Sequence, residues 1–386
     1  MRNILFILFI LLSAKIISFG QNTRILSPNA IVSLMTVSPG AELYSTFGHS
    51  AIRIFDPSQN VDRIYNYGTF DFDQPNFYIN FCRGKLLYVL DIERYKGFER
   101  GNAIDDRSMK EQVLDLTPLQ KERLFNLLEE NALPPNRSYK YDFFYDNCAT
   151  RIRDIVRNAL YDQVQFDSTP AASKLTMRQL LKPYLVNHPW TGFGIDLVLG
   201  MPTDRVSGAE NYMFLPDHLH DAFGSATLSE GVNLVGQEFN VPQIYIAGKL
   251  EEPSPITPFI VMCLVSVLGV LSMFHARSNR IFDFIFWFVL GIGGVIVFFL
   301  WFLTEHQATK NNLNLFWLLP THLLVFWRTR KEGLWESYFL ITAILAAGLL
   351  IGMKWLPQEL PVASIPILVL IVIKGVWRPK HQKEMA

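Results

Sequence analysis

Residues 256–276 read ITPFIVMCLVSVLGVLSMFHA, and residues 284–303 read FIFWFVLGIGGVIVFFLWFL. Neither stretch contains Asp, Glu, Lys or Arg. Each is long enough to supply the run of about 20 apolar residues with which an α-helix crosses the hydrocarbon core of a bilayer. The sequence therefore predicts two membrane-spanning helices, and the rest of the chain has to be organised around them.

Three shorter apolar segments follow, at residues 313–327, 337–353 and 360–376, and we expect each to span the membrane as well. Lys374 lies near the end of the last segment. We expect its ammonium group to reach the membrane surface on its flexible stem.

The placement of charge predicts the orientation of these five segments. With the preceding half of the chain outside, the outside loops contain two basic residues, Lys310 and Lys354, and the inside loops contain eight. The eight are Arg277, Arg280, Arg328, Arg330, Lys331, Arg378, Lys380 and Lys383. This asymmetry is the one that the positive-inside rule requires. We therefore predict a linker at 251–258 and an all-α five-helix transmembrane domain at 259–386 with a cytoplasmic C-terminus.

The first twenty residues have the features of a secretory signal peptide. Arg2 precedes an apolar run at 4–12, and the small residues Ser18 and Gly20 precede the expected cleavage point. An uncleaved anchor helix is the alternative. In both cases residues 21–250 are exported.

Composition excludes several classes of protein. The chain of 386 residues has 35 basic and 35 acidic side chains, and this balance argues against a nucleic-acid-binding protein. Its three cysteines, Cys82, Cys148 and Cys263, are too few for a disulfide framework. The sequence has neither a phosphate-binding loop nor a dinucleotide fingerprint, so we expect no cofactor.

Residues 21–250 combine the patterns of an α+β domain. Strand-type runs come first, at 30–37, 49–55, 61–67 and 86–90. A capping box formed by Thr117 and Gln120 begins a helix that ends before Pro134. A second helix is predicted at 148–160, with Asp146 or Asn147 as its cap. Residues 161–250 show no sustained period and are predicted only as a loop-rich α/β extension.

Cys148 is the candidate nucleophile because it stands in the first turn of the second predicted helix. The helix dipole and the unpaired backbone N–H groups favour a thiolate there, and Arg151 or Arg153 adds positive charge. His49 follows Gly48 at the start of a predicted strand and is the candidate base. From spacing alone, a packed cysteine and a structural histidine are the more common interpretation.

Two other groups of residues are interpreted as having no chemical role. Cys82 lies in an aromatic run and is interpreted as a packing residue. The segment 217–220 (DHLH) has metal-type ligands two residues apart, but no further His or Cys pattern completes a zinc site, so we expect no metal.

The order of a His-bearing strand and a later Cys-bearing helix resembles that of circularly permuted papain-like enzymes, such as NlpC-type hydrolases and lecithin:retinol acyltransferase. The whole chain is more similar still to the Lnb-type lipoprotein N-acyltransferases of Gram-negative bacteria, in which an exported thiol-enzyme domain precedes five transmembrane helices. The matching stretches are 45–53 (STFGHSAIR), 65–71 (YNYGTFD), 81–85 (FCRGK), 144–151 (FYDNCATR), 312–317 (NLNLFW) and 320–322 (PTH).

This resemblance implies a permuted papain-like (NlpC-like) periplasmic domain at 21–250, anchored in the bacterial inner membrane by a multi-pass domain. It implies that Cys148 is the nucleophile and His49 the base. Asn66, on the adjacent strand, is our candidate for the group that orients His49, although a turn residue before Gly68 is an equal interpretation. Further residues expected to help position substrate are Tyr145, Asn147 and Arg151 near the nucleophile and Glu305 and His306 in an outside loop.

The resemblance also implies a reaction. A fatty acyl group passes from a phospholipid or another glycerolipid to Cys148, and then to the N-terminal lipid-modified cysteine of a lipoprotein. Two alternatives remain open at this stage. One is a peptidoglycan endopeptidase or amidase with the same Cys and His. The other is a catalytically silent membrane scaffold.

Overall fold

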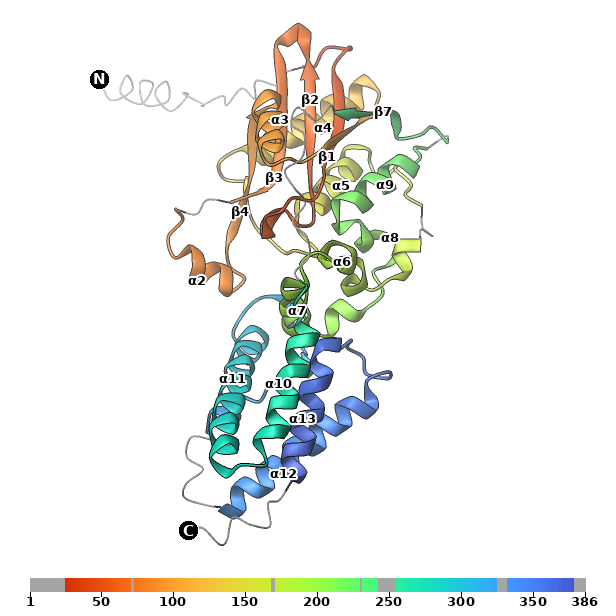
Figure 1. Cartoon of the computed structure of the whole chain (residues 1–386). Coiled ribbons are helices and arrows are strands. Elements are labelled where there is room, and N and C mark those ends of the chain that lie inside the picture. The colour runs from red at the N-terminus through yellow and green to blue at the C-terminus, as the bar shows by residue number, and fades with distance from the viewer. Residues whose placement is uncertain are drawn as a thin grey trace, which may run out of the picture.

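The computed structural model describes residues 25–70, 73–167, 171–229, 231–241, 255–324 and 332–377. The predicted signal peptide, the first half of the predicted linker (251–254), and the basic residues at 328–331 and 378–383 lie outside the described residues. An α+β domain forms one end of the molecule and a group of apolar helices forms the other (Figure 1).

The α+β domain is built on a single antiparallel sheet with the strand order β6-β4-β3-β2-β1-β5-β7. Its strands are β1 Ile31–Val37, β2 His49–Asp56, β3 Val61–Thr69, β4 Leu87–Arg94, β5 Met109–Leu114, β6 Ser138–Lys140 and β7 Val235–Val241. The four strand-type runs of the sequence correspond to β1–β4. The other three strands were missed because they are short or polar: β7, for example, lies at an edge of the sheet and exposes five successive residues.

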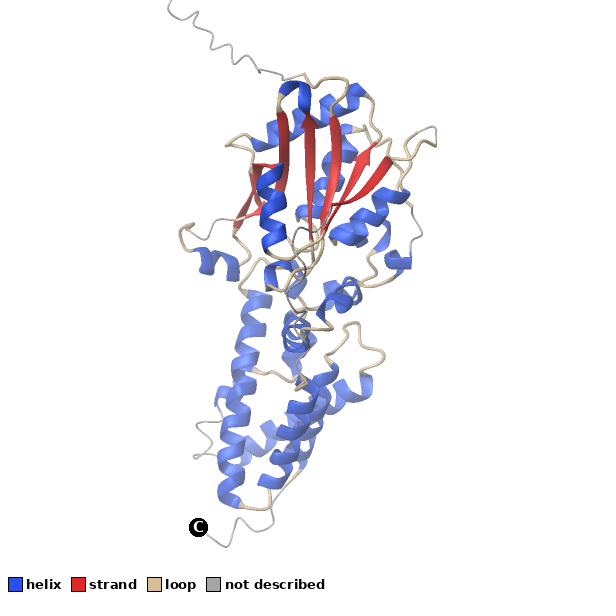
Figure 2. Cartoon of the chain, turned by 45° about the horizontal axis from the view of Figure 1, so that its top comes forward, coloured by secondary structure: helices blue, strands red, loops and turns tan. Residues whose placement is uncertain are grey.

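Helices cover both faces of this sheet (Figure 2). One face packs against α4 Pro118–Ala132, α5 Cys148–Ala159 and α9 Pro216–Ser225, and this contact forms the main hydrophobic core. The other face packs against α3 Tyr95–Ile104, whose buried Phe98 contacts a small cluster that includes Met35 and Ile64. A short helix, α2 Phe77–Cys82, projects beside β4.

The two predicted helix starts are confirmed. Thr117 caps α4, and the side chains of Thr117 and Gln120 make both hydrogen bonds of a capping box. Of the two candidate caps for α5, Asn147 is the one used, with Thr150 as its capping-box partner. Such caps hold the first helical turn in a fixed position, so the position of Cys148 follows from local sequence.

The region after α5 is more regular than the predicted loop-rich extension. It contains α6 Met177–Leu185, α7 Pro189–Val198, the 3-10 turn η4 Met201–Asp204, α8 Gly208–Asn211 and α9. None of these helices exceeds 10 residues, which is too short to show a sustained period. The helices α6 and α7 lie between the sheet and the membrane helices (Figure 1).

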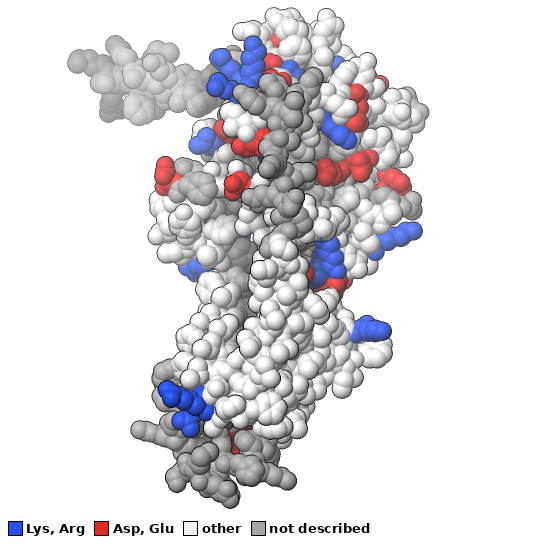
Figure 3. Space-filling view, viewed as in Figure 1, with Lys and Arg blue, Asp and Glu red and all other residues white. Residues whose placement is uncertain are grey.

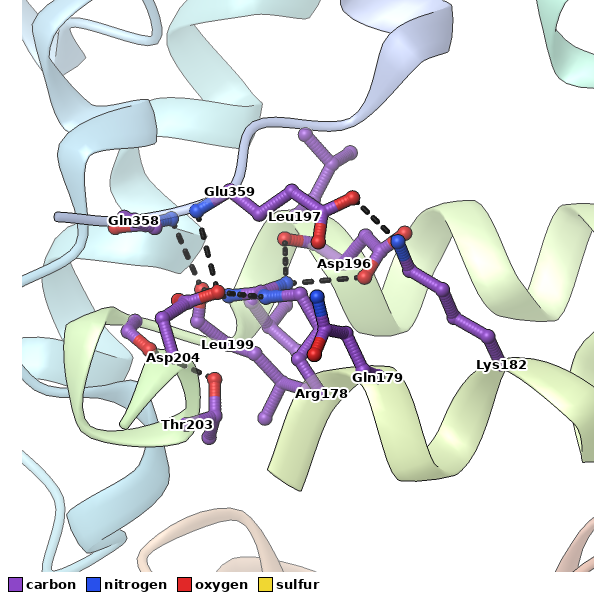
Figure 4. Close-up of polar contacts among 12 residues, drawn as sticks. Arg178, Gln179, Lys182, Asp196, Leu197, Leu199, Thr203, Asp204, Gln358 and Glu359 are labelled. Carbon is purple, nitrogen blue, oxygen red and sulfur yellow. Dashed lines mark hydrogen bonds and ion pairs between the residues drawn. The ribbon is translucent and has the colours of Figure 1, made fainter. Parts of the chain in front are cut away.

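Arg178 on α6 is the centre of the contact between this region and the membrane domain (Figure 4). Its guanidinium, only 1% exposed, pairs with Asp204 at 2.8 Å and with Asp196 at 3.0 Å, and it also donates to the carbonyl of Leu199 at 3.0 Å. The carbonyl of Leu199 accepts a second bond, at 3.1 Å, from the amide of Gln358 in the membrane domain. Asn312 and Lys182 make further bonds across the same contact, so the two domains are joined by directional polar contacts.

The membrane domain contains α10 Pro258–Ser272, α11 Ala276–Phe302, α12 Glu332–Gly352 and α13 Ile365–Val376. Within the described residues, α11 and α12 are long and apolar enough to cross a membrane, and α10 and α13 are shorter apolar helices. The surface over these helices is almost uncharged, and Lys and Arg side chains reappear at the end farthest from the sheet (Figure 3).

The third predicted span is not a regular helix over its described part. Residues 313–316 and 320–324 form 3-10 turns, and Leu319 between them is irregular. Pro320 lacks an N–H and disfavours helical geometry in the residue before it. The imidazole of His322 donates to the carbonyl of Trp317 at 3.1 Å and is bonded by Tyr338 at 2.7 Å. Irregular backbone at membrane depth requires such substitutes for helical hydrogen bonds.

The expectation for Lys374 is also wrong. Its side chain does not extend outward but is 5% exposed and pairs with Asp283 of α11 at 2.6 Å. Asn279 accepts a second bond from the ammonium at 2.8 Å. A charge buried among apolar helices needs an opposite charge and hydrogen bonds. The sequence did not predict this pair, because Lys374 and Asp283 are far apart along the chain.

Candidate active site

His49 is held at the first position of β2 by the backbone before it. Gly48 has a φ of +77°, and a side chain at this position would bring Cβ to 2.9 Å from the carbonyl oxygen of Val37. Glycine tolerates both this close approach and the left-handed backbone conformation, because it has no Cβ. The ring of His49 is then directed across the sheet toward β3, where its Nε2 lies 2.5 Å from Oδ1 of Asn66.

Asn66 has a fixed orientation of its own. Its Nδ2 donates to Oε1 of Glu93 on β4 at 3.2 Å, so its oxygen is the atom that faces His49. The imidazole therefore donates from Nε2, and Nδ1 is the ring nitrogen left to face the thiol. Asn66 is not a turn residue, since it pairs with Asp91 within the β3–β4 ladder.

Cys148 is the first residue of α5 and is buried. Asn147 fixes the turn by accepting bonds from the N–H groups of Ala149 and Thr150, both at 2.9 Å. Its amide nitrogen donates to the carbonyls of Phe143 and Phe214. The side chain of Asn147 is thus engaged in holding the helix start, directly beside the thiol.

Cys148 and His49 form a hydrogen-bonded pair whose charges stabilise each other. Burial raises the pKa of Cys148, but His49 and the backbone N–H groups of Ser50 and Ala149 outweigh burial and lower it below the ordinary value. Burial lowers the pKa of His49, but the bonds and charge of Cys148 together with Asn66 raise it overall. The structure therefore favours a thiolate paired with an imidazolium, the reactive form of a cysteine.

Tyrosines close the site on the side of Gly68. A Cβ built on Gly68 would lie 3.6 Å from Cβ of Cys148 and 3.9 Å from the hydroxyl oxygen of Tyr139. This hydroxyl is buried and has no hydrogen-bond partner among the described residues. Arg151 bonds both carboxylate oxygens of Asp146, and its guanidinium lies 3.7 Å above the Tyr139 ring.

The remaining predicted residues lie around this group or outside it. Tyr145 is 43% exposed on the turn that leads into Cys148. Glu305 pairs with Lys85 and Lys140, and His306 is 3.1 Å from the carbonyl oxygen of Phe81. Glu305 and His306 therefore join the membrane domain to α2, to the segment between α2 and β4, and to β6.

Tyr139 and Glu93 were missed by sequence reasoning. Neither belongs to a recognisable motif, although Gly68 behind the Tyr-Asn-Tyr triplet signals a close approach of some neighbour. Arg107 was missed as well: its pKa is lowered by burial, and its charge acts on both Cys148 and His49.

Two other expectations can be compared with the structure. Cys82 is not a packing residue: it is exposed at the end of α2. At 217–220 the imidazole of His220 lies 3.3 Å from the carboxylate of Asp221. Among the described residues, no three His, Cys, Asp or Glu side chains converge as metal ligands would.

Taken together, the chain is a membrane protein whose exported α+β domain brings together a buried cysteine, a histidine and an asparagine. Residues 18–183 match the model described as the Lnb N-terminal periplasmic domain, and residues 250–383 match the one described as the Lnb transmembrane domain. The chain belongs to the Lnb family, the family of lipoprotein N-acylation, which implies an acyltransferase. Neither the curated proteins nor the solved structures contain a significant match.

Proposed function

We propose that this protein is a lipoprotein N-acyltransferase that uses Cys148 as nucleophile, His49 as base and Asn66 as the group that orients His49. The observation that carries the proposal is the hydrogen-bonded Cys148–His49–Asn66 group at the start of α5. It occurs in a chain of the Lnb family with a periplasmic and a transmembrane domain.

The same group supports a fold assignment. A strand that begins with the catalytic histidine and a later helix that begins with the catalytic cysteine reverse the chain order of papain, in which the cysteine comes first. We therefore interpret the periplasmic domain as a circularly permuted papain-like domain of the NlpC type.

In the first half-reaction, the Cys148 thiolate attacks the ester carbonyl of a glycerolipid. The C–S bond forms and the carbonyl oxygen takes up negative charge. When this intermediate collapses, the ester C–O bond breaks, and the imidazolium of His49 gives its proton to the departing glycerol oxygen. The products are a thioester on Cys148, a lysolipid and a neutral His49.

In the second half-reaction, the neutral α-amine of a lipoprotein's lipid-modified N-terminal cysteine attacks the thioester. His49 accepts a proton from the amine, the C–S bond breaks, and Cys148 leaves as a thiolate. The result is an amide on the lipoprotein and the starting thiolate–imidazolium pair.

The hydroxyl of Tyr139 supplies a donor for the oxygen that becomes negative. It is buried and lacks a partner among the described residues, and a Cβ built on Gly68 would lie 3.9 Å from this hydroxyl and 3.6 Å from Cβ of Cys148. A hydroxyl whose bond is completed only by the developing oxyanion stabilises the transition state more than the ground state.

Attachment to the membrane favours lipid substrates over cell-wall peptides. Both the acyl donor and the lipid-anchored acceptor reside in the bilayer, so a site held at its outer surface meets each at high effective concentration. The polar contacts of Arg178, Gln358 and Glu305 hold the catalytic domain in this way. A soluble cell-wall peptidase has no need of them.

Mass spectrometry of lipoprotein N-termini tests the proposal. Cells that contain the protein should carry a third acyl chain, on the N-terminal amine, and cells with Cys148→Ser should not, because the histidine is tuned to a thiol and the serine hydroxyl has a far higher pKa. Cys82→Ser is the matched control and should keep the modification. Unchanged N-termini together with altered peptidoglycan fragments would instead support the endopeptidase or amidase.

A further inference from the structure

A polar cavity lies between the turn that precedes Cys148 and the membrane domain. It has a volume of about 520 Å³ and is lined by residues from three parts of the chain. They are Tyr145 from the turn before Cys148, Pro202 in η4 and Arg205 after it, Trp301 from the last turn of α11, and Gln307, Lys310 and Asn311 from the following loop. The cavity therefore adjoins both the nucleophile-bearing loop and the outer end of a membrane helix.

The cavity is cationic. Arg205 and Lys310 both line it, and none of its lining residues is an Asp or a Glu. Arg205 is exposed and makes no ion pair or hydrogen bond with the other described residues. Lys310 donates to the carbonyls of Trp301 and Thr304, at 2.7 and 2.6 Å, and has a third N–H to offer. Two positive charges thus face this space without a carboxylate to neutralise them.

The walls of the cavity are fixed to each other. The N–H of Gly200, just before η4, donates to the carbonyl of Ala308 at 2.8 Å. A Cβ on Gly200 would lie 1.9 Å from the carbonyl oxygen of Lys310, so this approach of two backbones requires glycine. The fold therefore holds the backbone that leads to Arg205 against the loop that carries Lys310.

We propose that this cavity binds the phosphate of a glycerophospholipid, with Arg205 as the principal ligand and Lys310 as the second cation. A guanidinium matches two phosphate oxygens with parallel hydrogen bonds. Trp301 lies at the membrane boundary, where indole rings are favoured, so a lipid in the outer leaflet presents its phosphate at this level while its chains stay in the bilayer.

The assignment rests on the proposed function and narrows its donor to phosphate-bearing glycerolipids. The ester carbonyls of such a lipid are only a few bonds from its phosphate. Tyr145 lines the cavity and precedes Cys148 by one short turn. A phosphate held by Arg205 restricts the ester to the neighbourhood of the nucleophile, which is how remote binding contacts accelerate a reaction.

Binding is measured first, because it does not depend on catalysis. The full chain with Cys148→Ser, in a detergent without phosphate, is titrated with dihexanoyl-phosphatidylglycerol and with dihexanoylglycerol. We expect the phosphate-bearing probe to bind at least about tenfold more tightly, and Arg205→Gln to remove about tenfold of that affinity, as loss of one charge-assisted bidentate contact implies. Arg205→Lys should restore part of it. Arg100→Gln, an exposed arginine on α3, is the matched control and should change nothing.

Acylation of Cys148 is the second readout, with long-chain phospholipid and diacylglycerol as competing donors. Arg205→Gln should slow the phospholipid reaction about tenfold, because it loses that same contact, and leave the diacylglycerol reaction unchanged. Binding that depends on Arg205 without any acyl adduct would support the cavity and count against the proposed function. Equal affinity for both probes, or tight binding of inorganic phosphate alone, would overturn the lipid assignment even if acylation proceeds.

Discussion

Arg178 and Cys148 are both buried ionisable groups, but their surroundings differ. All five N–H donors of the Arg178 guanidinium are used, by Asp204, by Asp196 and by the carbonyl of Leu199. Around Cys148, by contrast, the hydroxyl of Tyr139 is buried without a partner among the described residues. Every donor of the Arg178 guanidinium therefore has an acceptor, whereas the Tyr139 hydroxyl near Cys148 has none among the described residues.

The difference separates a structural role from a chemical one. A buried polar network in which every donor is satisfied gains nothing from a ligand and serves to hold one geometry. An unpaired donor beside a thiolate carries a desolvation cost that a substrate oxygen can relieve. The interdomain contact therefore behaves as a rigid support, whereas the hydroxyl of Tyr139 has the property that the proposed function requires of an oxyanion donor.

The strongest test of this comparison removes Arg178. Arg178→Met leaves Asp204 and Asp196 without their cation, so we expect the free energy of unfolding to fall by about 3–5 kcal/mol. Thermal or denaturant unfolding of the full chain in micelles measures this. Lys182→Met breaks the exposed pair with Glu359 on the same helix and should cost at most about 1 kcal/mol. Equal losses in the free energy of unfolding would show that the fully hydrogen-bonded Arg178 stabilises the protein no more than the exposed Lys182–Glu359 pair does.

Tyr139→Phe tests the role of the unpaired hydroxyl near Cys148. The substitution removes only the unpaired hydroxyl, so stability should stay the same or rise slightly. The rate of acyl-enzyme formation should fall about 100-fold, the typical effect of removing one oxyanion donor. Tyr67→Phe is a suitable control, because the hydroxyl of Tyr67 is already bonded by Asn131 at 2.9 Å. A Tyr139→Phe protein with the full rate would remove the hydroxyl from the mechanism.

Thiol reactivity as a function of pH tests the Cys148–His49 pair. The pKa of Cys148 is lowered from an ordinary value of 9.0, so its thiolate persists below that pH and is lost only as the pH falls through the lowered pKa. In a Cys82→Ser, Cys263→Ser background, alkylation by iodoacetamide should therefore remain fast at neutral pH. His49→Ala leaves burial as the main influence, and the profile should move to higher pH. An unmoved profile would mean that His49 does not stabilise the thiolate.

The reactive part of the site was predictable because local rules determine it. A capped helix start identifies Cys148, a glycine before a strand identifies His49, and the adjacent strand supplies Asn66. Tyr139 and Glu93 reach the site from β6 and β4, through strand pairing that no local pattern encodes. The catalytic roles of these residues stay predictions.

The fold shows the same division. Hydropathy located the apolar segments, and the capping boxes located α4 and α5. Hydropathy did not reveal the 3-10 turns at 313–316 and 320–324, because side-chain partners such as Tyr338, which bonds His322, lie on another segment. It also did not pair Lys374 with Asp283, since ion pairing across helices is a property of the folded chain.

The smallest effect is expected for Cys82→Ala. Cys82 is exposed at the end of α2, and the contacts of this helix with the membrane domain use backbone carbonyls: Phe81 accepts from His306, and Arg83 accepts from the N–H of Glu305 at 2.9 Å. Because the thiol takes no part in these contacts, the free energy of unfolding should change by less than about 0.5 kcal/mol. Acyl transfer, followed as the hydroxylamine-sensitive adduct and as N-acylated lipoprotein, should stay at the wild-type rate. A folded Cys82→Ala protein that forms the adduct but fails to pass it on would reveal a second thiol in the reaction, and the division between a complete support and a single reactive cysteine would then have to be abandoned.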